Sequence, residues 1–230
     1  MKNRLQYFID NPEVVTAALD MTKNKYRSHD PGWYLYRQVC KEKDFSKRFA
    51  DEFIELAYVT LHAWGMNDRA AQLADWEHFT SSIRDFRGHF KALSSYRLHE
   101  TNEADLNGSF QKYVWDMFSK MELVAPGKPR LVTYSKAFHF YLPDLFVPID
   151  RKYTLNYFYG HTNLPRDLRR QFEVLSDLHC EFSKFAPNVD FITTHDEIWN
   201  ASIPKVIDNI IIGYQKIIIG QQKGRKVRKR

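Results

Sequence analysis

Residues 131–159 read LVTYSKAFHFYLPDLFVPIDRKYTLNYFY, and this stretch decides the fold. It predicts an aromatic helix over 135–141, a break at Leu-Pro-Asp, a short apolar strap, and a second helix that starts at Asp150 and opens with Arg151 and Lys152. Burial raises the pKa of a carboxyl group, whereas adjacent cations and the amides of a helix start lower it. A carboxylate under both influences is a candidate general base or electrostatic catalyst.

Asp150 also suits a purely structural role. Asp is among the preferred N-cap residues, and here it can accept hydrogen bonds from the amides of Lys152 or Tyr153. The two roles predict different surroundings. A catalytic Asp150 faces a concave pocket lined by aromatic side chains, whereas a simple cap lies on a filled surface. The sequence leaves both roles open.

The order of these features resembles the catalytic motif of the helix-hairpin-helix superfamily of DNA glycosylases. In that family a hairpin leads into a helix, a short apolar stretch and a Pro-Val-Asp triplet whose Asp is catalytic. The same order is found here in Val132, Ala137, Phe138 and the triplet Pro-Ile-Asp at 148–150. The chain departs from the family at the hairpin, where 128–133 read KPRLVT and the Gly-x-Gly turn is missing. The resemblance covers about 30 of the 230 residues.

The resemblance implies a DNA glycosylase that flips a damaged or modified base out of double-stranded DNA and hydrolyses its N-glycosidic bond. Asp150 would be the catalytic carboxylate. Some relatives carry a Schiff-base lysine two residues before the helix alanine. If Ala137 matches that alanine, the lysine position is Ser135, and Lys136 lies one residue away. We therefore predict a monofunctional enzyme, with Lys136 as the less favoured catalytic residue. Repair and antiviral defence both remain open as roles.

Cations and large rings supply further candidates for contacts with DNA. Cationic and hydroxyl side chains near the two helix starts are candidates to hold phosphates, namely Lys128, Arg130, Ser135, Arg151 and Lys152. Rings and one amide are candidates to line a pocket for the flipped base, namely Trp33, Tyr34, Trp64, Asn67, Tyr134 and Phe138. Each set has a plain alternative, which is a solvated loop for the first and core packing or capping for the second.

The positive charge of the chain is concentrated at the end of the sequence. The net charge is +6, and six of the 34 basic residues lie in the last eight positions, 223–230; without them 34 − 6 = 28 basic residues balance 28 acidic ones. We expect a disordered basic tail over 221–230 that favours polyanions without reading their sequence, or that only improves solubility. Because of this tail, the alternative to a glycosylase is a non-catalytic helical protein that binds DNA or RNA. A protein-interaction module is a weaker third hypothesis.

Helical spacing dominates the rest of the chain, so the predicted fold class is all-α. Apolar residues at 49, 53, 56, 57 and 61 repeat as one helix face, which Gly65 ends. Further helices are expected over 12–21, 33–43, 83–95, 104–121, 166–185 and 205–219, with one more starting at Asn67 or Asp68 and a capping box at 194–197. Residues 1–220 are predicted to form one compact helical domain, as a single body or as two lobes with the cleft between them.

Several classes of protein are excluded by what the sequence lacks. Its two cysteines give no disulfide framework, its histidines show no metal-binding spacing, and it has no apolar run long enough to span a membrane. Motifs of metalloproteases, nucleotide triphosphatases and serine hydrolases are absent, as is a signal peptide at the beginning of the sequence. We expect a cytoplasmic monomer that acts on double-stranded DNA without a cofactor, metal or membrane.

Overall fold

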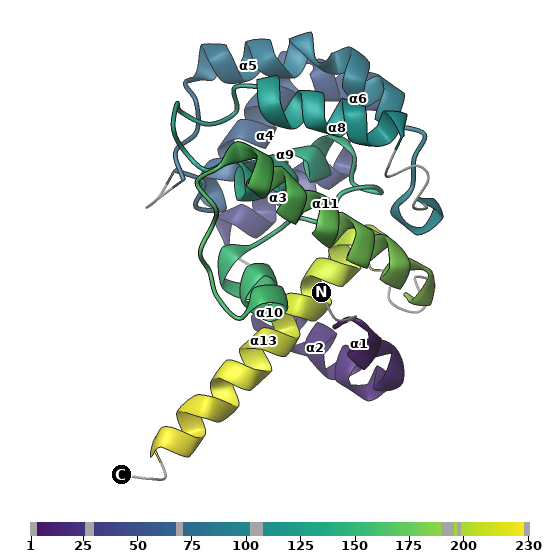
Figure 1. Ribbon diagram of the computed structural model, residues 1–230, viewed down its shortest axis with the longest axis vertical. Coiled ribbons are helices and arrows are strands. Elements are labelled where there is room, and N and C mark those ends of the chain that lie inside the picture. Colours follow the sequence, from purple (N-terminus) through teal and green to yellow (C-terminus); the bar gives the residue numbers. More distant parts are fainter. Residues whose placement is uncertain are drawn as a thin grey trace.

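The aromatic helix of the quoted stretch is α9 (Leu131–Tyr141), and it lies at the centre of the protein (Figure 1). All 11 of its residues are buried. A helix whose residues are buried around its whole circumference must be covered on every face by other elements. The computed structural model describes residues 4–25, 30–67, 71–101, 108–189, 196 and 199–227. Within these ranges all regular structure is helical, apart from isolated bridges that join Leu73 to Val124 and Asp196 to Asn200, so the all-α prediction is confirmed.

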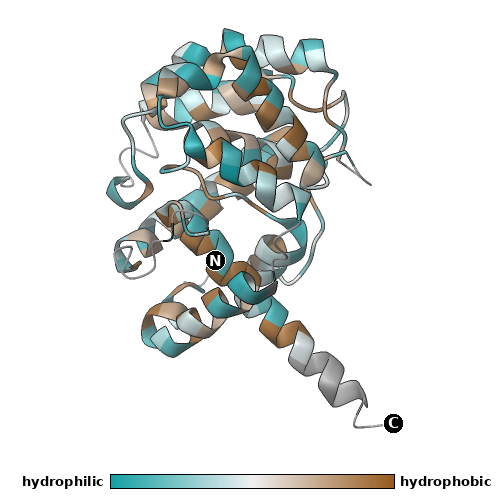
Figure 2. Cartoon of the chain, turned by 180° about the vertical axis from the view of Figure 1, so that it is seen from behind, coloured by the Kyte–Doolittle hydropathy of each residue, from teal (hydrophilic) through white to brown (hydrophobic). Residues whose placement is uncertain are grey.

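The other helices form two groups around α9 (Figures 1 and 2). One end of the molecule is built from α4 (Asp51–Ala63), α5 (Trp76–Asp85), α6 (Arg87–Leu93) and α8 (Ser109–Lys120). The other end is built from α1 (Gln6–Asp10), α2 (Pro12–Lys25), α10 (Asn156–Tyr159) and α13 (Ile203–Val227). Between them lie α3 (Pro31–Lys41) and α11 (Leu168–Phe185). Single turns complete the order, namely η1 (Phe45–Phe49), η2 (Leu98–Glu100), η3 (Arg151–Leu155) and η4 (Ala186–Asn188).

Several predicted helix bounds are wrong. The helix face that starts at Phe49 is divided, because η1 ends there and α4 begins at Asp51; α4 does end just before Gly65, whose φ is 75°. The helix expected to start at Asn67 or Asp68 does not begin at Asn67, and Asp68 lies outside the described residues; Leu73 pairs with Val124, and α5 starts only after its N-cap Asp75. The helix expected over 83–95 is interrupted at 86. The helix start expected at 104 and most of the capping box at 194–197 lie outside the described residues.

The last helix is confirmed as a helix, and it is longer than expected. It runs through Val227, so the basic tail continues α13 for seven residues of the 221–230 segment where we expected disordered chain. Its first half packs closely on α2, since a Cβ atom built on Gly213 would overlap the backbone carbonyl of Ala18. Its second half extends past the other helices (Figure 1). None of the described helices combines the length and the apolarity that a membrane span requires.

The strap that leads to Asp150 is held against α9 by two buried side chains. The Ser135 hydroxyl accepts a hydrogen bond from the Ile149 amide (3.0 Å) and donates one to the Val132 carbonyl (2.9 Å). His139 donates from Nδ1 to the Phe146 carbonyl (2.7 Å), because a carbonyl oxygen can only accept. These bonds satisfy buried backbone groups of a segment that has no regular structure, and they fix where η3 begins.

Candidate functional site

Asp150 is the N-cap of η3, as its position in the sequence predicts. Its Oδ1 accepts hydrogen bonds from the amides of Lys152 (2.8 Å) and Tyr153 (3.1 Å). Its other oxygen, Oδ2, lies 3.9 Å from the Nζ of Lys136, and 33% of the side chain is exposed. Capping therefore occupies one oxygen, and the second remains directed toward a buried cation.

Lys136 and Asp150 line a cavity of about 250 Å³, which we call the inner cavity. Its walls come from α3, the end of α4, α9, the strap, η3 and the first half of α13, together with Trp199. Five aromatic side chains line it, Trp33, Tyr36, Trp64, Tyr153 and Trp199. Five charged side chains also line it, Asp30, Lys136, Asp150, Lys205 and Asp208. The inner cavity thus combines ring faces with hydrogen-bonding groups of both signs.

A second hollow, the outer cleft, adjoins the inner cavity. Its volume is about 530 Å³, and it is lined by residues before and in α9, by η3 and by the segment that follows α10. Arg151 and Lys152 lie in this cleft. Trp64 and Asp150 line both the outer cleft and the inner cavity. Asp150 therefore stands at the boundary between a cleft with two cations and a cavity lined by aromatic side chains.

The second ion pair of the inner cavity is more buried than the first. Lys205 Nζ lies 2.6 Å from Asp208 Oδ2, and the two side chains are only 6% and 5% exposed. Lys205 Nζ also lies 5.5 Å from the centroid of the Tyr36 ring and 5.7 Å from that of Trp199. Such positions over ring faces stabilise a desolvated ammonium group.

Burial shifts the pKa values of two of these four groups, Lys136 and Asp208, in the direction that favours the neutral form. Burial lowers the pKa of Lys136, and the negative charges of Asp150 and Asp208 oppose that shift. Burial raises the pKa of Asp208, and the neighbouring Lys205 opposes that shift. Ion pairs in a desolvated site persist only when the partners are close, and removing one partner leaves the other charge uncompensated.

A buried histidine connects the wall of the inner cavity to the strap. The Tyr36 hydroxyl donates to His139 Nε2 (2.7 Å), because the proton of that imidazole is on Nδ1 and bonds Phe146. Burial is the main cause that lowers the pKa of His139 to about 3, so its ring is neutral at pH 7. Tyr36 is thereby held in place by the same helix that carries Lys136.

Four of the residues singled out in the sequence lie together in the inner cavity, Trp33, Trp64, Lys136 and Asp150. The position of Lys136 differs from the expectation based on the relatives' lysine. Ser135, at that position, is fully buried and bonds the strap, so it cannot reach a phosphate, and Lys136 faces the cavity instead.

Four predicted pocket residues do not line the inner cavity. Tyr134 and Phe138 are completely buried in the core, where the Tyr134 hydroxyl donates to the Met121 carbonyl. Tyr34 is 57% exposed, and Asn67 is exposed at the end of the turn after α4. An aromatic residue on a helix buried on all sides is more often core than pocket wall, and this explains the two errors in α9.

The residues predicted to contact phosphates also lie in different places. Arg151 and Lys152 line the outer cleft, although Arg151 Nε already donates to the Thr162 carbonyl (2.9 Å). Arg130 has a structural role, because its Nη1 donates to the carbonyls of Phe118 (2.7 Å) and Met121 (3.0 Å). Lys128 is half-buried in the loop before α9 and lines neither hollow.

Of the ten aromatic and charged residues that line the inner cavity, sequence analysis missed six, Asp30, Tyr36, Tyr153, Trp199, Lys205 and Asp208. A signal did exist for two of them. Lys205 and Asp208 are charged residues three positions apart in the apolar run IPKVIDNIII, and charges in a buried helix need partners. The three aromatic residues carried no comparable signal.

Neither metal ligands nor known relatives point to a function. Across the described ranges, no group of three or more His, Cys, Asp or Glu side chains is placed to hold a metal ion. The chain matches no protein-family model, no curated protein and no solved structure. The function is therefore argued from the chemistry of the inner cavity and the outer cleft.

Proposed function

We propose that the protein is a DNA glycosylase that binds a flipped base in the inner cavity and cleaves its N-glycosidic bond. The observation that carries this proposal is the position of Asp150. Its carboxylate stands between the outer cleft and the aromatic inner cavity, with one oxygen fixed by backbone amides and the other free of them. A simple cap on a filled surface would not line two hollows.

The chemistry of base excision needs a fixed negative charge at this boundary. Breaking an N-glycosidic bond builds positive charge on the sugar, and a preorganised carboxylate stabilises that charge and can orient the attacking water. In this arrangement the sugar lies next to Asp150, and the phosphates on either side lie in the outer cleft near Arg151 and Lys152. The helix-capping bonds hold the Asp150 carboxylate in one orientation and so contribute to preorganisation.

The inner cavity has the properties that a flipped base requires. An engineered apolar cavity of about 150 Å³ holds benzene, so about 250 Å³ has room for a one- or two-ring base. The ring faces of Trp33 and Trp64 supply stacking surface. The Lys205–Asp208 pair offers a donor beside an acceptor for the edge of the base. The indole N–H of Trp33 is buried and finds no acceptor in the part of the chain that the structure describes.

The decisive test is the Asp150→Asn variant. Asn is also a good N-cap, so the fold should be kept, and a loss of stability beyond a few tenths of a kcal/mol would come from the buried Lys136 ammonium group left without its partner. Loss of the charge should lower the rate of base release about 100- to 1000-fold. The measurement is single-turnover release of free base from DNA that carries a panel of damaged and hypermodified bases, beside a melting curve.

Asp167→Asn is the matched control for this test. Asp167 is the N-cap of α11, where it accepts a hydrogen bond from the Arg170 amide (2.8 Å), and it lines neither hollow. It should release base at the wild-type rate. If Asp150→Asn also does so, Asp150 is only a cap. Binding of DNA or RNA by the wild type without release of any base would instead favour the non-catalytic alternative.

A further inference from the structure

The two ammonium groups of the inner cavity have N–H donors that the protein itself does not use. An ammonium group has three such donors. Lys205 Nζ donates to Oδ2 of Asp208 (2.6 Å) and has no second hydrogen-bond acceptor in the described ranges. Lys136 Nζ makes no hydrogen bond there, since its ion-pair partner, Oδ2 of Asp150, lies 3.9 Å away. Both side chains line the cavity, so a ligand bound in it meets donors that lack an acceptor.

Asp208 places an acceptor beside both of these donors. Its Oδ2 pairs with Lys205, while its Oδ1 accepts no hydrogen bond from the described chain and is not completely covered by protein atoms. The negative charge of Asp208 also acts on Lys136, where it opposes the effect of burial on the pKa. The other two carboxylates of the cavity cap helices, Asp30 at α3 and Asp150 at η3. Asp208 is therefore the carboxylate of this wall that no backbone amide engages.

These three charged groups gather around one ring, that of Trp64. Lys136 Nζ lies 5.4 Å and Lys205 Nζ 5.7 Å from the centroid of the Trp64 ring. Asp208 is bonded directly to Lys205 and so belongs to the same part of the cavity. A planar base that enters this part meets two donors and one acceptor at its edge.

We propose that the inner cavity selects bases with an imide edge, whose two carbonyl oxygens accept hydrogen bonds from Lys136 and Lys205 and whose N–H donates to Asp208. An imide presents an acceptor, a donor and an acceptor in a row, which complements an ammonium, a carboxylate and a second ammonium group. Uracil, its 5-substituted derivatives and xanthine have this edge. The inference rests on the proposed function, because it takes the occupant to be a nucleobase.

Bases that carry an exocyclic amino group fit this wall less well. In cytosine and adenine the amino group replaces one carbonyl oxygen, so it turns a donor toward an ammonium group and leaves both without an acceptor. Such unmade hydrogen bonds are costly in a buried site, and they allow strong discrimination between bases of the same shape. Ordinary thymine also has an imide edge, but its pairing with adenine opposes flipping more than a mismatch does.

The test compares three free bases as probes, by isothermal titration of the full chain without DNA. They are 1-methylthymine, 1,3-dimethylthymine, in which a methyl group blocks the N–H, and 1,5-dimethylcytosine, in which an amino group replaces one carbonyl oxygen. The first should bind about tenfold or more tighter than either of the others, because each change removes a hydrogen bond to a charged group. This comparison uses only the wild type, so it does not depend on how a variant folds.

A double variant tests whether the named residues cause the preference. Lys205→Met combined with Asp208→Leu removes the donor and the acceptor together, so neither charge is left buried without its partner. The preference for 1-methylthymine should fall about tenfold or more in this protein. Lys128→Met is the matched control, since Lys128 lines neither hollow, and it should keep the wild-type preference.

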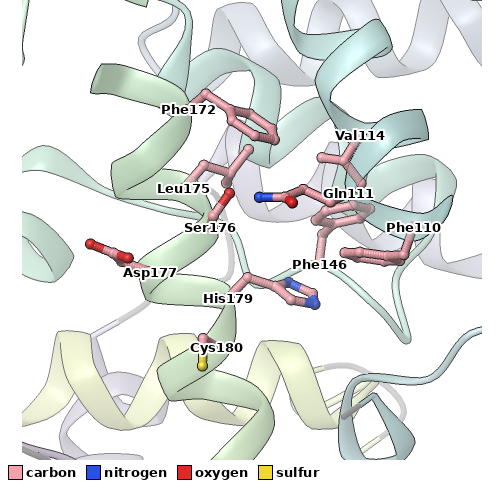
Figure 3. Close-up of a pocket in the computed structure, with 10 residues that line it drawn as sticks. All are labelled: Phe110, Gln111, Val114, Phe146, Phe172, Leu175, Ser176, Asp177, His179 and Cys180. Atoms are coloured by element: carbon pink, nitrogen blue, oxygen red, sulfur yellow. The ribbon is translucent and has the colours of Figure 1, made fainter. Parts of the chain in front are cut away.

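A separate cavity between α8 and α11 serves as a control for the place of binding. Its volume is about 270 Å³, and its wall carries no Lys or Arg (Figure 3). Ser176 lies in that wall (Figure 3), so Ser176→Phe places a ring in this cavity without touching the inner one. The variant should bind 1-methylthymine with the wild-type affinity. A loss of binding in it would place the probe in the wrong cavity and overturn the proposal.

Release of bases from duplex DNA separates this inference from the glycosylase proposal. A preference for 1-methylthymine without release of any base would exclude the glycosylase and keep the imide selectivity. The selectivity is overturned if 1-methylthymine does not bind at millimolar concentration, if the three probes bind equally, or if the double variant keeps the preference. Faster release of cytosine- or adenine-type bases than of uracil opposite guanine would also overturn it, while the glycosylase proposal would stand.

Discussion

The two carboxylate oxygens of Asp150 have different partners. Oδ1 accepts the two amide bonds of the helix start, and Oδ2 faces the Lys136 ammonium group at 3.9 Å. The two hypotheses raised by the sequence, cap and catalyst, are therefore compatible in one side chain. A cap also fixes the rotamer of the carboxylate, and a fixed rotamer is what electrostatic stabilisation of a developing charge requires.

Lys136 decides whether the proposed enzyme uses water or an amine as its nucleophile. Burial lowers the pKa of Lys136 and so favours the neutral amine that could attack a sugar carbon, whereas Asp150 favours the charged form. We predict that Asp150 keeps Lys136 protonated and that water is the nucleophile. Borohydride should then trap no covalent complex between the wild-type protein and substrate DNA.

Two lysine variants make the trapping experiment specific. An adduct that forms in the wild type and in Lys205→Ala, but not in Lys136→Ala, would contradict the prediction and identify Lys136 as the nucleophile. An adduct lost only in Lys205→Ala would identify the other buried amine of the inner cavity. Both variants need a melting curve, because Lys136→Ala leaves the half-buried Asp150 without its partner and Lys205→Ala leaves the buried Asp208 without its partner.

At the residue scale, sequence reasoning located Asp150 because an Asp that follows an apolar stretch and precedes a helix is a local pattern, which the sequence shows directly. It also located Trp64, which follows α4 in a turn closed by Gly65. It failed for Tyr134 because local pattern does not distinguish a ring that faces a cavity from one that faces the core. Trp199 could not be found at all, since only long-range packing places it in the wall of the inner cavity, where its indole N–H donates to the Thr22 hydroxyl of α2.

At the scale of elements, the close approach of α13 to α2 holds the start of α13, and thus Lys205 and Asp208, against the inner cavity. Gly213 permits this approach, because a Cβ atom there would overlap the carbonyl oxygen, carbonyl carbon and Cα of Ala18. These are backbone atoms, so a clash cannot be relieved by turning a side chain. The whole of one helix has to move.

We therefore predict that Gly213→Ala destabilises the protein. Overpacking of a tight core contact typically costs about 1 to 3 kcal/mol, and a clash with backbone atoms belongs at the upper end. A loss of this size lowers the melting temperature of a chain of this length by roughly 5 to 10 °C. Thermal unfolding followed by circular dichroism measures the change.

Gly220→Ala is the matched control in the same helix. Nothing lies within 4 Å of a Cβ atom built there, and the residue is exposed. The substitution should leave stability unchanged or raise it by up to about 1 kcal/mol, because Ala favours helix more than Gly does. Equal melting temperatures for Gly213→Ala and the wild type would show that α2 and α13 do not pack as closely as described here.

Which segments are helical was largely predictable from sequence, whereas several helix starts were not. Apolar spacing identified α11 to within two residues at its start, because its pattern continues over five turns. The start of α5 was missed because Leu73 pairs with Val124, some fifty residues away in the chain, and such a bridge leaves no local signal. The helix-hairpin-helix arrangement itself stays a prediction.

At the scale of the whole molecule, buried neutral histidines should make the fold sensitive to mild acid. Burial lowers the pKa of His139 to about 3 and that of His179 to about 4, both below the ordinary value of 6.5. The unfolded chain therefore binds more protons than the folded protein between these values, and stability is lost as pH falls below about 6.5. Each histidine should lower the free energy of unfolding by about 2 kcal/mol between pH 7 and pH 5.

Urea unfolding at pH 7, 6 and 5 measures this loss. His179→Leu removes one of the two groups and should reduce the loss between pH 7 and pH 5 by about half, after allowance for its lower stability at pH 7. The comparison of the two proteins cancels contributions from other titrating groups, Asp208 among them. A variant with the same pH dependence as the wild type would show that His179 takes up a proton as readily in the folded state as in the unfolded one.

The distribution of charge over the whole chain leads to the last prediction. The six cations between 223 and 230 account for the entire net charge of +6, and the helical backbone carries the first of them away from the body of the molecule along α13 (Figure 1). Basic groups that neutralise DNA phosphates release counterions, and each contact contributes about 0.9 to the slope of log K against log salt.

Replacing all six cations by Gln keeps the length of the chain and removes only charge. This variant should bind DNA more weakly, with a salt slope reduced by up to about 5, and melt at the wild-type temperature. Fluorescence anisotropy with labelled duplex DNA over a range of salt concentrations measures the slope, and the same slope in both proteins would exclude the tail as a DNA contact. If base release at low salt also stays at the wild-type rate, the inner cavity and the outer cleft are sufficient for the chemistry, and the tail serves only to increase the rate of encounter with DNA.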